Sequence, residues 1–220
     1  MASTIVRDAD TPGSRERMLE ATITLMRRSG LSGAGINEIV RESGAPKGSV
    51  YHFFPQGKQQ IVSEALAVYS SRVLAFMETA LSAGRTPGGR VRALFRAFAE
   101  RLEQGDFGSS CAAGAVCLDL DEDLEGLRLA IEAVFDDWTA LIARKLGFAD
   151  ERRARSFAGL LLTAIEGGYI RGRAERSGRP FLEAGQWLAA LADGEAMRGV
   201  PGAQRLHLAA APRRHRATET

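Results

Sequence analysis

Helical periodicity runs through nearly the whole chain. Apolar residues recur three and four positions apart, as in Leu19, Ile23 and Met26, and no convincing run of alternating β-branched residues is present. This spacing gathers apolar side chains on one face of an α-helix, whereas a strand would need a period of two. The sequence therefore predicts an all-α protein.

Glycine and proline divide this pattern into nine expected helices. Gly30, Gly44, Pro55 and Gly84 stand at four of the breaks, because these residues favour helix ends over helix interiors. The expected helices cover residues 14–30, 36–43, 46–54, 58–81, 87–104, 111–120, 124–146, 151–175 and 180–197. We expect residues 1–13 to be flexible and residues 198–220, rich in Gly, Pro, Ala and Arg, to form a disordered basic tail.

Composition restricts the setting in which the chain works. It has 220 residues, of which 45% are hydrophobic and 25% charged, as in ordinary globular proteins. No stretch has the length of a membrane span or the pattern of a signal peptide, so we expect a cytoplasmic protein without a membrane partner. Cys111 and Cys117 match neither zinc-ligand nor disulfide spacing, and we expect no metal and no cofactor.

Charge is unevenly distributed along the chain, although the net charge is only +2. Residues 1–60 carry eight Lys/Arg against six Asp/Glu, residues 61–197 carry sixteen against twenty, and residues 198–220 carry five against one. Two of the three lysines, Lys47 and Lys58, fall within the segment ESGAPKGSVYHFFPQGKQQI, residues 42–61. The chain is thus mildly basic at both ends.

The three helices expected within residues 14–54 have the proportions of a helix-turn-helix unit, with a tight turn at residues 43–45. At about 100° per residue, the third helix gathers Val50, Phe53 and Phe54 on one side. We expect this side to pack on the first two helices. The opposite side carries Lys47, Gly48, Tyr51 and His52.

The polar side of this helix suits the major groove of duplex DNA. Lys47 can neutralise a phosphate or reach a guanine edge, while Tyr51 and His52 can donate hydrogen bonds to phosphate oxygens. Gly48 leaves room for the DNA backbone or sugar. Lys58 begins the next helix, where free N–H groups favour an anion, so it is expected to hold a flanking phosphate.

Residues 35–61, GINEIVRESGAPKGSVYHFFPQGKQQI, resemble the DNA-binding region of the TetR family of bacterial transcriptional regulators. The motif GAPKGS-YH-FP-GK is most similar to the LmrA/YxaF-like branch of this family. This resemblance implies DNA contacts by Lys47, Ser49, Tyr51 and His52 and a phosphate contact by Lys58. Ala34 stands where the branch usually has threonine, so we expect Gly35 and Asn37 to cap the second helix instead.

The resemblance also implies two domains: a helix-turn-helix DNA-binding domain over residues 14–56, and a helical domain over residues 57–197 that binds a small molecule and forms a homodimer. Six aromatic residues on expected inward faces are candidates for the ligand pocket, although aromatic residues at helical spacing are also common in plain cores. These candidates are Phe76, Phe95, Phe98, Phe135, Trp138 and Tyr169.

The dimer is expected to form a four-helix bundle from residues 151–175 and 180–197 of each subunit. The expected interface residues are Ala158, Leu161, Leu162, Ile165, Trp187 and Leu188. Two-fold pairing would hold the recognition helices about 34–36 Å apart, so that they read a palindrome. The resemblance thus implies a nucleoid-associated bacterial repressor that a small hydrophobic or aromatic ligand releases from a palindromic operator.

Two other functions remain open from the residues: a redox-sensing regulator that uses Cys111 or Cys117, and a helical adaptor without regulatory function. Catalysis is disfavoured. Only three histidines occur, no Ser/His/Asp order is recognisable, and SGAPKGS lacks the spacing of a phosphate-binding loop.

Overall fold

The computed structural model describes residues 13–194, and every regular element in that part of the chain is helical. The elements are α1 (Ser14–Gly33), α2 (Ile36–Ser43), α3 (Gly48–Phe53), α4 (Lys58–Ser82), α5 (Pro87–Gln104), α6 (Ala112–Cys117), a 3₁₀ helix η1 (Glu122–Leu124), α7 (Glu125–Leu146), α8 (Glu151–Glu175) and α9 (Arg179–Asp193). The all-α prediction is confirmed. The expected basic tail and residues 1–12 of the expected flexible terminus lie outside the described residues.

The first helix does not stop at Gly30 as predicted but bends there and continues to Gly33. Ser29 and Gly30 leave helical dihedral angles, and Gly30 has a φ of +67°. A Cβ on Gly30 would lie 2.6 Å from a carboxylate oxygen of Asp119. That carboxylate accepts hydrogen bonds from the backbone N–H and hydroxyl of Ser32, at 2.8 and 2.9 Å. The kink therefore accommodates a side chain from a distant part of the sequence.

Two further helix starts differ from the predictions. The third helix begins at Gly48 instead of residue 46, because Pro46 and Lys47 form a tighter turn in which the Pro46 carbonyl accepts from the Ser49 N–H at 2.9 Å. The sixth helix begins only after Cys111, whose extended backbone places its sulfur 3.5 Å from the Gly114 N–H.

The expected capping of α2 by Asn37 is wrong. Gly35 occupies the N-cap position, and no side chain caps the helix by a hydrogen bond. Ala34, one residue earlier, is completely buried.

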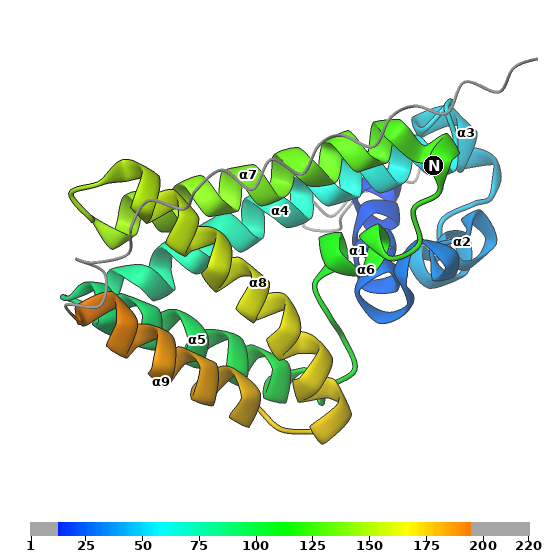
Figure 1. The fold of residues 1–220 in the computed structure, drawn as a ribbon. Helices are drawn as coiled ribbons and strands as arrows, with labels where there is room; N and C mark the ends of the chain where they lie inside the picture. The colour runs from blue at the N-terminus through cyan, green and yellow to red at the C-terminus, as the bar shows by residue number, and fades with distance from the viewer. Residues whose placement is uncertain (1–12, 195–220) are drawn as a thin grey trace, which may run out of the picture.

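Figure 1 shows how the helices are arranged. The helices α1 to α3 cluster at one end, while α4 and α7 run side by side away from them. The pair α5 and α9 forms the opposite side, and α8 packs against both α7 and α9. The short α6 lies at the junction, where it contacts α1.

One continuous apolar core joins these parts. It includes Met18 and Phe54 near α3 as well as Phe95 and Phe181 between α5 and α9. Each such side chain contributes roughly 1.5–3 kcal/mol when buried. No helix within residues 13–194 combines the length and the apolar character needed to span a bilayer. The division predicted between residues 56 and 57 falls just before α4 and stays a prediction.

Candidate nucleic-acid interface and effector cavity

The turn between α2 and α3 is fixed by local backbone geometry. Gly44 ends α2 with a φ of +62°, in the left-handed region where a side chain is strained. The Ala45 N–H donates to the Ser43 hydroxyl at 3.3 Å, and Arg17 Nε on α1 donates to the Ser43 carbonyl at 3.2 Å. These contacts set the direction in which α3 leaves the turn.

The two predicted faces of α3 are largely confirmed. Val50 and Phe54 are fully buried, whereas Tyr51 is 60% exposed and His52, Lys47 and Gly48 are also exposed. Phe53, expected to be buried, lies at the edge of this division and is half-buried, with its ring 4.9 Å from that of His52. Ser49 is also half-buried. The polar face is therefore available to an external molecule.

The fold does not require a glycine at position 48, in contrast to other glycine positions of this region. No heavy atom lies within 4 Å of a Cβ added at this position, and its φ is not positive. In contrast, Gly44 and Gly57 both have positive φ angles. The bare backbone at the start of α3 thus has no internal explanation.

Lys58 is less accessible to an external phosphate than the sequence suggested. It is half-buried at the start of α4 and lines a groove that also contains Ser32, Asp119 and Asp121. The pKa of Asp119 is lowered, first by hydrogen bonds from Ser32 and to a lesser extent by the positive charge of Lys58. A phosphate near this lysine would therefore meet neighbouring acidic groups as well.

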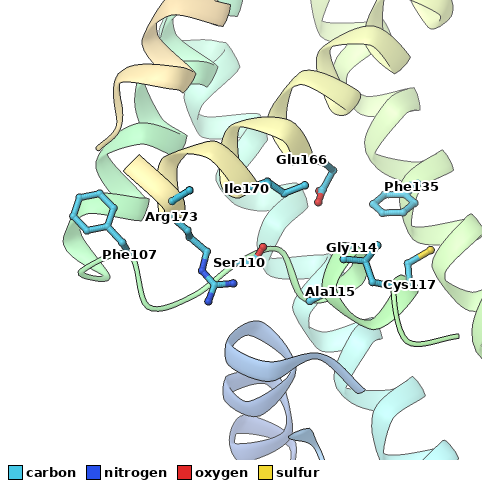
Figure 2. Close-up of a pocket in the computed structure, with 11 residues that line it drawn as sticks. Phe107, Ser110, Gly114, Ala115, Cys117, Phe135, Glu166, Ile170 and Arg173 are labelled. Carbon is cyan, nitrogen blue, oxygen red and sulfur yellow. The ribbon is translucent and has the colours of Figure 1, made fainter. Parts of the chain in front are cut away.

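A cavity of about 660 Å³ opens between α6, α7 and α8 (Figure 2). Its lining consists of Phe107, Ser110, Gly114, Ala115, Cys117, Leu118, Phe135, Glu166, Ile170, Arg173 and Ala174. A much smaller inner cavity of about 10 Å³ adjoins it through Glu166, which lines both. A space of this size and lining is typical of a small-molecule site.

The predicted pocket residues divide into three groups. Phe135 lines the larger cavity, while Phe98, Trp138 and Tyr169 line the inner one. Phe76 and Phe95 line neither of them. Phe76 packs against Phe98 at 5.1 Å between ring centroids, and Phe95 fills the space beside α9, where a Cβ on Gly185 would lie 2.5 Å from it.

Glu166 is the one acidic side chain among the cavity residues that sequence reasoning missed. Its Oε1 has no hydrogen-bond partner among the described residues, and a Cβ on Gly114 would collide with its carboxylate. Burial raises the pKa of this carboxyl to about 7, and a hydrogen bond with the thiol of Cys111 opposes part of that rise. In the sequence, this residue could have been found as an acidic residue that interrupts the apolar stripe between Leu162 and Tyr169.

The chain segment that forms one wall of the cavity is fastened to α1. Arg27 Nε donates to the Ser110 carbonyl at 3.2 Å, and another nitrogen of the same guanidinium donates to the Ser109 hydroxyl at 2.9 Å. The Ser110 N–H donates in return to the Arg27 carbonyl at 2.8 Å. Beyond α6, Asp119 is bound to Ser32 of α1. Both ends of the α6 segment are thus tied to the helix that supports α3.

Comparison with known proteins agrees with this geometry. Residues 18–65 match the model of the bacterial regulatory proteins of the tetR family, and residues 87–187 match the C-terminal domain of LmrA/YxaF-like transcriptional regulators. The regulator YxaF of Bacillus subtilis is 31% identical over 172 residues, which cover 77% of this chain and 90% of YxaF. The chain belongs to the TetR family. It falls in the LmrA/YxaF-like branch of these DNA-binding, non-enzymatic transcriptional regulators.

One further relative and one solved structure are similar to this TetR-family regulator. Rv0196, a transcriptional regulator of Mycobacterium tuberculosis, is 32% identical over 179 residues, or 77% of this chain and 89% of that protein. A cysteine mutant of CifR, solved with 26-base-pair operator DNA, has the same fold with a TM-score of 0.70. It is 17% identical and covers 83% of this chain and 98% of its own.

The expected dimer helices of this TetR-family protein carry an exposed apolar surface. Of the six predicted interface residues, Trp187 is exposed, at 76%, and the other five side chains are buried within the subunit. Those five are Ala158, Leu161, Leu162, Ile165 and Leu188. The exposed apolar side chains on α8 and α9 are instead Leu160, Ile170, Leu182, Trp187 and Leu191.

Proposed function

We propose that this regulator is a homodimeric repressor that binds a palindromic operator through the polar face of α3. The observation that carries the proposal is the open space around Gly48, because the protein gains nothing from a missing side chain there. Lys47 and Ser49 flank this bare backbone, and Tyr51 and His52 follow one turn later. A close approach to DNA sugar and phosphate accounts for the arrangement.

The test uses duplex DNA selected by the wild-type protein from a random pool. Lys47→Ala should lower affinity and reduce the salt slope of binding by about one, because one phosphate contact is lost. Tyr51→Ala should also lower affinity. Arg96→Ala, on the exposed face of α5, is the control and should bind as the wild type does. The proposal fails if both α3 variants keep the wild-type affinity and slope.

We propose further that a small apolar or aromatic ligand enters the cavity between α6, α7 and α8 and releases the DNA. A ligand shifts the protein only by its differential affinity for the two states, so it must act on an element that differs between them. In this proposal the element is the α6 segment, since it lines the cavity and the chain on either side of it is hydrogen-bonded to α1.

The dimer in this proposal uses the exposed side chains of α8 and α9. A second subunit would cover Leu160, Leu182 and Trp187, which otherwise remain in water. Trp187→Asp should convert the dimer to a monomer in light-scattering measurements and weaken operator binding. A dimer that persists in this variant would place the interface elsewhere.

A further inference from the structure

The cavity between α6, α7 and α8 holds a carboxylate that lacks a full set of partners. Glu166 Oε1 is buried and accepts no hydrogen bond within the described chain. Buried polar atoms are nearly always hydrogen-bonded, and an unpaired one costs free energy. Because Glu166 lines both the larger cavity and its inner extension, a bound molecule can supply the missing donor.

An exposed arginine, Arg173, also lines this cavity and is a cation without a partner in the described part of the chain. Arg173 lies seven residues after Glu166 on α8, two helical turns or about 10 Å along the same face. It makes no hydrogen bond or ion pair with any residue in the range 13–194. The neighbouring arginines of this helix end differ, because Arg171 pairs with Glu175 and Arg176 with Asp106.

An apolar surface separates these two charges. Figure 2 shows Glu166, Ile170 and Arg173 projecting from α8 toward the segment that includes α6. Phe135 on α7 lies across the inner part of the cavity, and Leu118 also lines it. The cavity thus presents an acid inside, an apolar middle and a base near the last turns of α8.

We propose that the cavity takes an elongated amphoteric ligand with an apolar body, whose protonated amine pairs with Glu166 and whose anionic group pairs with Arg173. The inference rests on the ligand-binding role proposed above and narrows the chemical class of the ligand. An amine supplies the donor that Oε1 lacks, and charge-assisted hydrogen bonds are the stronger kind. An anionic outer end matches the one unpaired cation that lines this cavity among the described residues.

The test measures calorimetric binding of three biphenyl probes to the full chain. The amphoteric probe is 4′-(aminomethyl)biphenyl-4-carboxylic acid, and the matched probes lack either its amine or its carboxyl group. We expect the amphoteric probe to bind about tenfold or more tightly than either matched probe, as for a single charged contact. Glu166→Gln should abolish the advantage of the amine and Arg173→Gln that of the carboxylate, while Arg96→Gln should change nothing.

Two results would overturn the inference. The first is that all three probes bind with equal affinity, or that none of them binds. The second is that Glu166→Gln and Arg173→Gln bind the amphoteric probe as tightly as the wild type does. Thermal unfolding of both variants verifies that they are folded. Measuring operator release in parallel separates the two proposals. Charge-dependent binding without release would refute the ligand-released repressor only, whereas release by the probes without charge preference would refute only the amphoteric class.

Discussion

Replacing Gly48 by alanine should stabilise the protein and at the same time weaken its binding to DNA. A Cβ at this position meets no heavy atom within 4 Å, and the backbone there does not have the positive φ that favours glycine. Alanine restricts the unfolded chain more than glycine does, which adds about 0.4–1 kcal/mol to the free energy of unfolding. Nothing inside the subunit offsets this gain.

The effect on DNA has the opposite sign. The added methyl group stands on the exposed face of α3, where we propose that the DNA backbone approaches closely. An extra methyl in a closely packed contact costs roughly 1–3 kcal/mol, which corresponds to about a 5- to 150-fold loss of affinity. Because this contact is steric, the salt slope of binding should change much less than in Lys47→Ala.

Urea unfolding and fluorescence polarisation with the selected duplex measure the two effects. Gly126→Ala is the matched control, since Gly126 also lies in the first turn of a helix, α7, with no heavy atom near an added Cβ. It should gain stability but keep its affinity. Unchanged DNA binding by Gly48→Ala would refute the close approach of the DNA backbone to this residue. A loss of stability would show that position 48 has no space for a Cβ.

Other predictions concern the core and the junction. Phe54→Ala should lower the free energy of unfolding by about 3–5 kcal/mol in urea titrations, because this fully buried ring anchors the recognition helix. Trp138→Phe should cost roughly 1–3 kcal/mol, since the buried Ser70 hydroxyl loses the indole N–H that donates to it at 3.1 Å. Asp119→Asn should destabilise the protein at neutral pH. The pKa of Asp119 is lowered in the fold by Ser32, so its contribution is complete above the unfolded value of about 3.9 and disappears as the pH falls through the lower folded value. Urea titrations should therefore show the difference in stability between the two proteins shrink as the pH falls below that unfolded value.

The elements that local chemistry determines could be predicted from the sequence. Gly44 ends α2 and Pro55 follows the end of α3, and the spacing of Val50 and Phe54 separates the buried side of α3 from its exposed one. The kink at Gly30 could not be predicted in this way. It depends on Asp119, which is 89 positions later in the sequence.

The cavity and the exposed apolar surface of α8 and α9 were harder to predict for a related reason. Periodicity identifies an apolar stripe on a helix but not which neighbour that stripe faces. On α8 the stripe of Leu161 and Ile165 packs inside the subunit, while Leu160 and Ile170 remain exposed. Aromatic residues drew attention to the pocket, yet the side chain that distinguishes it chemically is the single acid Glu166.

The attachment of α6 has a genetic consequence. Six residues, Ala112–Cys117, form this helix, and the segments on either side of it are hydrogen-bonded to α1. Substitutions that enlarge its small side chains alter the contact between cavity and α1 without touching α3. Under the proposed ligand-released repression, a selection for mutants that repress normally but no longer respond to the ligand should therefore be enriched in this stretch, and mutants that fail to repress should cluster in α2 and α3 instead.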